Sequence, residues 1–507
     1  MKNVLDLLDY ACKKYSDNTY VSDSENILTF SELRSKAQAV GSYILAKSIS
    51  NRAVAVYMQQ SANSVLSMFS VIYSGNFYVV IDKDMPADRI EMIFAKVSPA
   101  MIICDASTCE KAKNFSIPYV LIDEAQKHEK NAHALQKVRE SCVDTDLLYI
   151  LFTSGSTGVP KGTAVCHKNV IAYTEWLCDA FSIDDKTVIG NQAPFYFSMS
   201  VSDVYGALRG GAQIQIIPKI LFSFPVKLIE YMNERKINYT YWVPSAYGIV
   251  CHMKGLDVIK PSYLKTVLFA GEVMPAKYLN YWRKQIPDAV YANLFGPTET
   301  TDICCYYKVD RDIPDNSTIP IGKPCDNCRC IVVKEDGTLA EGSEVGELYV
   351  CGSFVALGYY GDKEKTDAAF VQDPTQSLYP SVMYRTGDLV RRNSFDEFEY
   401  ISRKDSQIKR MGYRIEIGEI EAAVGNIDKI KVCCVIYEKA CDCIALVYQG
   451  RKLAKQDIAD VIKQRLPDYM MPNMYIRVDE MPYNSNGKID KNALLKNFET
   501  LKEGELQ

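Results

Sequence analysis

Apolar runs that alternate with helical patterns constrain the fold of this chain most strongly. Two runs, "RAVAVYM" (52–58) and "AMIICD" (100–105), have the composition of buried strands, and "SANSVLSMFSVIYSG" (61–75) between them has the pattern of a helix. The alternation continues from residue 147 to residue 400, with strand-like runs such as "TVLFAG". Because parallel strands need crossover helices, this order predicts an α/β fold with largely parallel sheets.

The pattern changes twice towards the C-terminus. Between about 310 and 400, short segments such as "EDGTLAEG" and "GELYVCG" predict a β-rich subdomain. After "YISRKDSQIKRMGYRIE" a helix, two strands and another helix follow, and 507 residues exceed a single ordinary core. We therefore expect a large N-terminal domain of layered sheets with helices plus the β-rich subdomain (1–403), and a small mobile α+β C-terminal domain (404–507).

Composition excludes several classes of function. The net charge is −5 and the sequence contains no long basic run, so nucleic-acid binding has little electrostatic support. No apolar run is long enough to span a bilayer. The N-terminal "MKNVLDLLDYACKKY" has helical spacing but lacks the apolar core of a signal peptide, so a cytoplasmic location is expected.

The 17 cysteines are scattered along a long chain, which favours reduced thiols over a disulfide framework. One cluster, "CDNCRC", holds Cys325, Cys328 and Cys330. A zinc site usually needs a second pair of ligands, and the four histidines do not offer one at suitable spacing. We therefore interpret these cysteines as structural.

The segment "TSGSTGVPKG" (153–162) resembles a P-loop at first sight. Pro160 and Gly162 break the pattern G-x-x-x-x-G-K-[ST], and apolar strand-like runs flank the segment on both sides. It is therefore predicted to join two strands, with a helix beginning only near Lys168 or Asn169. Its hydroxyls, glycines and Lys161 suit phosphate binding, although a solvated loop explains the composition equally well.

The decapeptide resembles the phosphate loop of the adenylate-forming superfamily, which includes acyl-CoA synthetases, luciferases and nonribosomal peptide adenylation domains. Seven further segments match the superfamily in order along nearly the whole chain. They are "LTFSEL", "SGNFYVVIDKDMPADRI", "NLFGPTET", "GELYVCG", "YRTGDL", "SRKDSQIKRMGYRIEIGEIE" and "NSNGKID". The sequence of these segments is most similar to that of stand-alone D-alanine–carrier protein ligases and nonribosomal peptide synthetase adenylation domains.

The resemblance implies an AMP-forming carboxylate–thiol ligase. In such a reaction a carboxylate attacks the α-phosphate of ATP, and the enzyme must neutralise charge on two anions. Thr298 resembles the threonine that contacts phosphate, and Glu299 the carboxylate that holds Mg²⁺. The resemblance assigns the ATP phosphates to the loop residues Thr153, Ser154, Gly155, Ser156, Thr157, Gly158 and Lys161.

Further nucleotide contacts are implied in the same way. Asn293 matches an asparagine at the adenine amino group, Phe295 a ring that stacks on adenine, and Gly296 belongs to the same motif. Asp388 matches the aspartate that accepts hydrogen bonds from the ribose diol, and Arg403 an arginine near the ribose and phosphate. The usual glycine before that arginine is serine in this chain, a small departure.

The C-terminal motifs imply movement between two half-reactions. Asp405 aligns with the hinge about which the small domain rotates. Lys488 matches the catalytic lysine that bridges the substrate carboxylate and the ribose side of ATP. Lys409 and Gly412 belong to the segment that lines the path of the thiol in the second half-reaction.

The acid is less clearly specified, because amino-acid-activating relatives have an aspartate where this chain has Ser198. Asp302 is the one carboxylate among the implied pocket residues, and an unpaired buried carboxylate is costly. We hypothesise that Asp302 receives a substrate amine, as in a β-amino acid. The rival hypothesis is a neutral aryl or hydroxy acid. The implied pocket comprises Ser198, Met199, Ser202, Ser245, Leu268, Ala270, Leu294, Asp302 and Ile303.

The expected acceptor is the phosphopantetheine arm of a separate carrier protein, because no carrier-like segment follows in the sequence given. Coenzyme A is the second choice, since it presents the same thiol, and the alternative function is therefore an aryl- or acyl-CoA ligase. A nucleotide-binding protein without catalysis is a third reading. The presence of Thr298, Glu299, Asp388, Arg403 and Lys488 together speaks against it.

Overall fold

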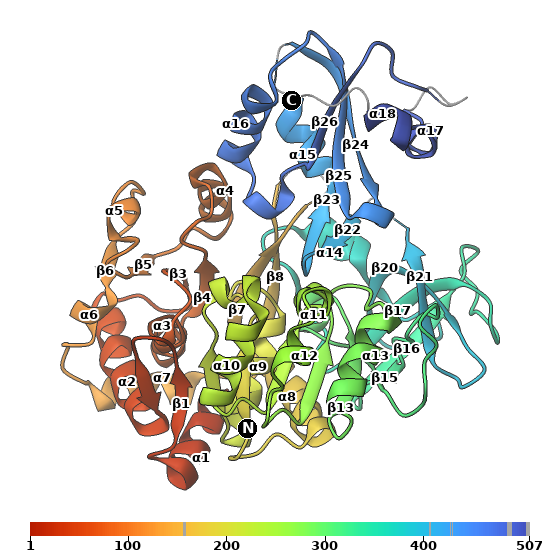
Figure 1. The fold of residues 1–507 in the computed structure, drawn as a ribbon. Helices are drawn as coiled ribbons and strands as arrows, with labels where there is room; N and C mark the ends of the chain where they lie inside the picture. The colour runs from red at the N-terminus through yellow and green to blue at the C-terminus, as the bar shows by residue number, and fades with distance from the viewer. Residues whose placement is uncertain (156–158, 405–406, 426, 428, 484–488, 503–507) are drawn as a thin grey trace. The chain divides into compact units, whose positions relative to one another are not determined.

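The computed structural model describes residues 1–155, 159–404, 407–425, 427, 429–483 and 489–502 (Figure 1). The packing of the chain defines two units. The first unit holds Met1–Lys83, Val97–Leu151 and Gly162–Lys404, and the second holds Asp84–Lys96, Phe152–Lys161 and Asp405–Gln507. Asp405, the predicted hinge, lies outside the described residues.

A nine-stranded sheet forms one layer of the first unit. Its six central strands are parallel, and antiparallel strands complete both edges. In spatial order the strands are β15 (Lys323–Pro324), β14 (Cys305–Lys308), β13 (Val290–Phe295), β12 (Thr266–Phe269), β11 (Tyr239–Trp242), β9 (Val188–Asn191), β10 (Gln213–Ile216), β1 (Thr19–Ser22) and β2 (Ile27–Thr29).

A seven-stranded sheet forms the second layer. Its strands β3 and β4 are buried along their whole length, which explains their uninterrupted apolar sequences. In spatial order the strands are β18 (Gly358–Tyr359), β8 (Lys161–Cys166), β7 (Leu147–Thr153), β4 (Phe77–Ile81), β3 (Ala53–Tyr57), β5 (Met101–Cys104) and β6 (Tyr119–Leu121).

Helices pack between and around these sheets. Helix α3 begins at a capping box formed by Ser61 and Ser64, and it contacts β3 and β4 of one sheet and β1 of the other. Helix α9 contacts β9 and β10, and its Tyr205 hydroxyl lies 2.9 Å from that of Tyr78 on β4. The two sheets therefore share one apolar core.

The helices of the first unit are mostly short. They are α1 (Leu5–Tyr15), α2 (Phe30–Ala46), α3 (Ala62–Tyr73), α5 (Cys109–Ala112), α6 (Ile122–Ala125), α7 (Ala132–Ser141), α8 (His167–Phe181), α9 (Met199–Gly210), η1 (Lys219–Ser223), α10 (Pro225–Glu234), α11 (Pro244–His252), α12 (Gly255–Val258), α13 (Ala276–Gln285), η2 (Thr298–Thr300) and α14 (Lys363–Ala369).

The predicted β-rich subdomain is a five-stranded antiparallel sheet at the end of the first unit. Its long strand β20 pairs with three others, and Asp388 on β20 lies opposite Arg403 on β21. The strands are β16 (Cys328–Val333), β17 (Gly346–Gly352), β20 (Val382–Arg392), β19 (Phe370–Gln372) and β21 (Phe398–Arg403).

The second unit has its own small core of α and β elements. Strand β25 lies between β24 and β26, and β22 and β23 form a separate hairpin. The elements are α4 (Ala87–Val97, up to Lys96 in this unit), β22 (Gln407–Arg410), β23 (Tyr413–Glu416), α15 (Ile417–Val424), β24 (Ile430–Glu438), η3 (Lys439–Cys441), β25 (Cys443–Gly450), α16 (Lys455–Arg465), η4 (Asp468–Met470), β26 (Met474–Val478), α17 (Lys491–Lys496) and α18 (Phe498–Leu501).

The α/β fold class and the β-rich segment are confirmed, and so are the C-terminal helices and the two strands between them. The segment between β7 and β8 joins two strands, as predicted. The helix after it begins at His167, one residue earlier than expected, because Asn169 caps it through the backbone N–H of Cys166. The hairpin β22–β23 and strand β26 were not anticipated.

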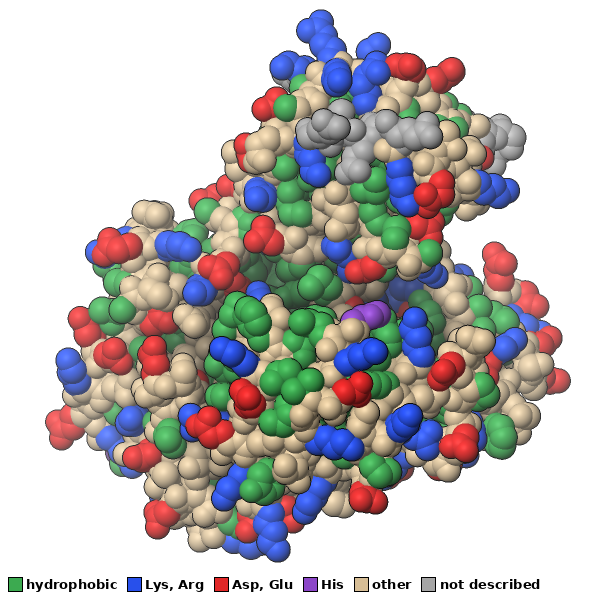
Figure 2. All heavy atoms as spheres, in the orientation of Figure 1, with side chains coloured by type: hydrophobic (Ala, Val, Ile, Leu, Met, Phe, Trp, Pro, Cys, Tyr) green, Lys and Arg blue, Asp and Glu red, His purple; other side chains and the backbone are tan. Residues whose placement is uncertain are grey.

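The surface carries both signs of charge. Figure 2 shows lysine and arginine side chains interspersed with aspartate and glutamate over the face turned to the viewer. Among the described residues, no helix combines the length and the apolar character that crossing a membrane requires.

His167 makes the first unit sensitive to acid. It is buried at the start of α8, where its Nδ1 accepts a hydrogen bond from the backbone N–H of Val4, 3.4 Å away, and its Nε2 lies 3.4 Å from the amide of Asn3. Burial lowers the pKa of His167 from 6.5 to about 4; Arg139 lowers it further and Asp6 opposes the shift. His167 is therefore protonated below about pH 6.5 in the unfolded chain but only below about pH 4 in the folded chain.

We expect this proton to lower the free energy of unfolding by about 2 kcal/mol between pH 7 and pH 5. The variant His167→Asn keeps an acceptor for Val4 and should not show this loss, whereas exposed His133→Asn should behave as the wild type. All three tryptophans lie in the first unit, so tryptophan fluorescence during urea unfolding reports on that unit. An equal loss in wild type and His167→Asn would contradict the assignment.

Candidate active site

The predicted pocket and nucleotide-binding residues follow the carboxyl ends of neighbouring parallel strands. Ser198 comes after β9, Ser245 after β11, Ala270 directly after β12, and Gly296 directly after β13. These strands are parallel neighbours, so their carboxyl ends meet at one edge of the nine-stranded sheet. Ligands of open α/β sheets bind at this edge.

Asp302 is the centre of a buried polar cluster. Its Oδ2 accepts hydrogen bonds from the hydroxyls of Ser202 (2.8 Å), Tyr173 (3.0 Å) and Tyr241 (3.0 Å). Burial raises the pKa of Asp302 to about 6, although these hydroxyl bonds oppose the shift. The carboxylate is 2% exposed, and within the described part of the chain no lysine or arginine is among its hydrogen-bond partners. A cationic group on a ligand would therefore find an anionic acceptor here that is already held in position.

Ser198 connects this cluster to the predicted phosphate-binding threonine. The Ser198 hydroxyl is a hydrogen-bond partner of the Asp302 carboxyl, and it accepts a bond of 3.4 Å from the Thr298 hydroxyl. One hydrogen-bonded series thus connects Asp302 and Ser202 through Ser198 to Thr298. We call these four residues, together with Tyr173 and Tyr241, the Asp302 cluster. A group bound at Asp302 would lie close to Thr298.

A strained turn presents Asp302. The backbone N–H of Asp302 donates to the carbonyl of Thr300 at 2.7 Å, and Thr301 between them has φ 66° and ψ −56°. This is the rare γ-turn with positive φ, and a β-branched residue in it is strained by roughly 1–3 kcal/mol. The Thr301 hydroxyl donates to the carbonyl of Phe354 at 2.7 Å. Gly296 packs so closely that a Cβ there would lie 2.2 Å from the Asp302 carbonyl oxygen.

The other predicted pocket residues divide into two groups. Ser245 is the second residue of α11, and its backbone N–H donates to the carboxylate of Glu272 at 2.9 Å. The apolar members are all buried in the main core of the first unit: Met199, Leu268, Ala270, Leu294 and Ile303. Their contact with an acid stays a prediction.

The predicted adenine residues lie at the end of β13. The Asn293 side-chain amide donates to the carbonyl of Pro320 at 2.8 Å, which orients the amide oxygen as the remaining acceptor. An acceptor is what the amino group of adenine requires. The ring of Phe295 lies 6.2 Å from that of Tyr400 on β21, centroid to centroid.

Asp388 and Arg403, the predicted ribose residues, form a buried ion pair. The Arg403 guanidinium donates to Oδ1 of Asp388 at 2.9 Å, across the β20–β21 pair. The backbone N–H of Asp388 donates to the Thr386 hydroxyl at 3.0 Å. A carboxylate with one oxygen held by arginine is suited to a diol, because the ion pair fixes its orientation.

Glu299 fits the predicted Mg²⁺ ligand in the chemistry of its donor atoms, since Mg²⁺ prefers carboxylate oxygens. It lies in the short helix η2, fully buried, and its Oε1 accepts a hydrogen bond from the Tyr359 hydroxyl at 2.7 Å. This bond fixes the orientation of the carboxylate. Ion binding by Glu299 remains a proposal.

The loop between β7 and β8 belongs to the second unit, where its donors contact carboxylate and carbonyl oxygens. The Lys161 ammonium lies 3.5 Å from Oε1 of Glu416, and the backbone N–H of Gly155 donates to Glu419. The Ser154 hydroxyl donates to the carbonyl of Arg414 and accepts from the backbone N–H of Glu416.

Thr153, at the end of β7, has a buried hydroxyl without a hydrogen-bond partner in the described part of the chain. Gly155 and Lys161 contact carboxylates and Ser154 donates to a carbonyl, and the orphaned Thr153 hydroxyl adds a further potential donor. That chemistry fits the phosphate oxygens of ATP.

Several predicted residues fall outside the described ones: Ser156, Thr157, Gly158 and Lys488. Lys409 lies on β22, and Gly412 (φ 79°) follows Met411 (φ 51°) in the tight turn between β22 and β23.

Sequence reasoning missed three buried residues near Asp302. Tyr173 on α8 and Tyr241 on β11 donate to it, and their only sequence signal is that a buried tyrosine hydroxyl needs a partner. Asp203 follows Ser202 on α9; its Oδ2 accepts from Asn191 at 2.7 Å and its Oδ1 has no partner among the described residues. Burial raises the pKa of Asp203 well above its usual range.

The pattern that defines the AMP-binding enzymes matches residues 8–360. The chain belongs to the AMP-binding enzyme family. This AMP-binding enzyme is 29% identical to L-proline–[L-prolyl-carrier protein] ligase of Pseudomonas fluorescens, over 98% of the chain and 100% of the relative. It is also 29% identical to D-alanine–D-alanyl carrier protein ligase of Bacillus licheniformis, over 97% of the chain and 99% of the relative.

The fold of this AMP-binding enzyme matches that of solved adenylation domains. The crystal structure of the Vibrio cholerae adenylation domain AlmE, in complex with glycyl-adenosine-5'-phosphate, superimposes with a TM-score of 0.86 at 18% identity, over 99% of this chain and 98% of that one. At this identity the likeness shows the fold alone. It agrees with the predicted large N-terminal and smaller C-terminal domains.

Proposed function

We propose that this chain activates a small amino-bearing carboxylic acid with ATP, releasing pyrophosphate, and transfers the acyl group to the phosphopantetheine thiol of a carrier protein. The observation that carries the choice of acid is the Asp302 cluster, in which a buried carboxylate is hydrogen-bonded to hydroxyls and adjoins Thr298. The choice of acceptor is supported by two relatives named as carrier-protein ligases that match over their whole lengths.

In this proposal the polar residues have separate roles. Asp302 pairs with the ammonium of the acid, and the substrate carboxylate then lies on the side of Thr298. Asp388, held by Arg403, binds the ribose diol, and the Asn293 oxygen accepts from the adenine amino group. Holding both reactants in this order lowers the entropic part of the barrier.

The negative charge of the ATP phosphates must also be neutralised, and we assign this role to a metal ion and to the basic and hydroxyl groups of the loop. Glu299 would hold Mg²⁺, which neutralises phosphate charge when bound. Lys161 and the hydroxyls of the loop would engage the β- and γ-phosphates. Asp405 as hinge, with Lys409 and Gly412 beside the path of the thiol, would serve the second half-reaction.

The acceptor is tested by offering the enzyme two thiols. Purified enzyme is incubated with ATP, Mg²⁺ and a panel of amino acids, together with either a D-alanyl or peptidyl carrier protein bearing phosphopantetheine, or coenzyme A. Intact-mass spectrometry should show one acyl group added to the carrier protein and none to the same carrier without its arm. Formation of acyl-CoA with an unchanged carrier would instead identify a CoA ligase.

A further inference from the structure

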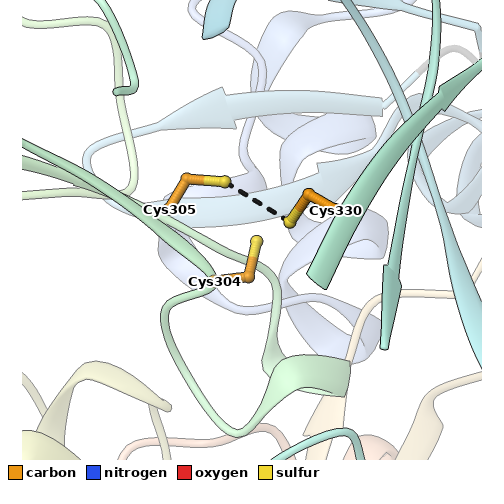
Figure 3. A group of neighbouring side chains, drawn as sticks. All are labelled: Cys304, Cys305 and Cys330. Atoms are coloured by element: carbon orange, nitrogen blue, oxygen red, sulfur yellow. Dashed lines mark hydrogen bonds between the residues drawn. The ribbon is translucent and has the colours of Figure 1, made fainter. Parts of the chain in front are cut away.

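Four cysteine side chains from two sheets gather beside the turn that presents Asp302. Cys304 and Cys305 lie at the start of β14, and Cys328 and Cys330 lie on β16. The sulfurs of Cys304, Cys305 and Cys330 are all within 4.8 Å of one another (Figure 3). Cys330 is the centre of the group, because its sulfur lies 3.7 Å from that of Cys305 and 3.8 Å from that of Cys328. We call these four residues the cysteine cluster.

The backbone explains how the four sulfurs converge. Residues i and i+2 of a strand point to the same face, so Cys328 and Cys330 on β16 share one face. Neighbouring residues of a strand point to opposite faces, but Cys304 precedes β14 and lies in a bend. The bend allows Cys304 and Cys305 to point the same way, and Figure 3 shows their side chains directed towards Cys330.

The sulfur spacing around Cys330 is compatible with a shared metal ion: Cys304, Cys305 and Cys330 form the mutually close set, and Cys328 adjoins it through Cys330. Four sulfurs that each lie about 2.3 Å from a tetrahedral Zn²⁺ are about 3.8 Å apart. The two distances from Cys330 are within about 0.1 Å of that value. All four cysteines are free of disulfides, and an all-sulfur set is soft, which favours Zn²⁺ or Cu⁺ over Mg²⁺.

The surroundings allow an ion to enter and then keep it. Cys304, Cys305 and Cys330 are buried, whereas Cys328 is half-buried and gives the cluster an edge towards the surface. A bound ion would displace the thiol protons, as thiolate sites in general require.

We propose that the cysteine cluster is a structural site for one thiophilic d¹⁰ metal ion, foremost Zn²⁺. The ion would join β14, which follows the strained turn at Thr301, to β16 of the five-stranded sheet. It would stabilise the turn that presents Asp302 and would take no part in the chemistry of the reaction. The "CDNCRC" motif alone lacks a second pair of ligands, and the fold brings Cys304 and Cys305 beside it.

The test measures metal binding by the full-length chain. Protein purified with a non-chelating reductant and stripped with a chelator is titrated with Zn²⁺ alone, and bound metal is counted after gel filtration. Wild type should retain one ion per chain, and Co²⁺ in its place should give the thiolate-to-metal charge-transfer absorption of a tetrahedral sulfur site. Zn²⁺ should also raise the melting temperature by a few degrees.

Cys330→Ser should lose the retained ion, the charge-transfer band and the thermal shift together. The matched control is Cys178→Ser, a buried cysteine whose sulfur donates to the carbonyl of Gly206 in another part of the same unit; it should behave as the wild type. Cys328→Ser, at the edge of the cluster, perturbs packing least and should weaken Zn²⁺ binding roughly tenfold or more.

Three outcomes would overturn the proposal. The first is wild type that retains no Zn²⁺ and gives no Co²⁺ band. The second is a Cys330→Ser or Cys328→Ser protein, folded by circular dichroism, that binds Zn²⁺ as tightly as wild type. The third is a loss of metal in Cys178→Ser that equals the loss in the cluster variants.

Discussion

Asp302→Asn is expected to reduce amino-acid-dependent ATP–pyrophosphate exchange by about 10²–10³-fold. The substitution keeps the volume and the hydroxyl contacts of Tyr173, Tyr241 and Ser202, but it removes the charge that would pair with a substrate ammonium. Removing one partner of a buried ion pair costs about 3–5 kcal/mol. Because the ammonium is bound both before and during the reaction, the loss should fall mainly on KM for the amino acid.

Asp203→Asn is the matched control for this experiment. Asp203 is an equally buried aspartate that follows Ser202, but its Oδ2 accepts from Asn191 and it is not part of the Asp302 cluster. Burial also raises its pKa well above the usual range. We expect the control to keep exchange within a few-fold of wild type. If Asp302→Asn left KM for the amino acid unchanged, Asp302 would not be the ammonium acceptor, and a neutral acid bound through its hydroxyl would become the better hypothesis.

Lys488→Ala is expected to lower the rate of exchange by about 10²–10³-fold while ATP binding persists. The reaction brings a carboxylate to a phosphate, and a single positioned donor at the developing charge contributes about this much. The role of Lys488 rests on its motif, since this residue lies outside the described ones. Isothermal titration with ATP should give an affinity near that of wild type, which separates a loss of chemistry from a loss of binding.

Lys491→Ala is the control for charge in the same C-terminal segment. Lys491 begins α17, and its ammonium lies 3.0 Å from the carboxylate of Glu421, so it is already paired. This variant should exchange pyrophosphate like wild type. If chemically made aminoacyl adenylate is supplied, Lys488→Ala should still transfer the acyl group to the carrier. Equal defects in both half-reactions, or in both lysine variants, would contradict a specific role for Lys488.

The layered fold follows from sequence pattern because each buried strand carries its own signal. Residues 53–57 and 77–81 are apolar throughout because both faces of these central strands are covered. The segment at Pro160 was readable too, since proline and glycine there exclude a P-loop helix. By contrast, β26 was missed because its mixed sequence "MYIRV" becomes a strand only by pairing with β25.

The candidate site was predictable in its motif residues and not in its geometry. Asp302 could be singled out as a lone carboxylate, but its donors Tyr173 and Tyr241 come from distant elements that only folding brings together. The positive φ of Thr301 was equally hidden, because threonine avoids that conformation and tertiary contacts impose it. For the same reason, neither "CDNCRC" nor the pair Cys304 and Cys305 indicates the cysteine cluster alone.

The proposed function is tested most sharply by ATP–pyrophosphate exchange over a panel of acids, each paired with its analogue lacking the amino group. We expect exchange that depends on a small amino-bearing acid and is at least about a hundredfold weaker with the deaminated partner. Equal exchange with both members of every pair would contradict the role of Asp302. The absence of exchange with any acid would contradict acyl-adenylate formation itself.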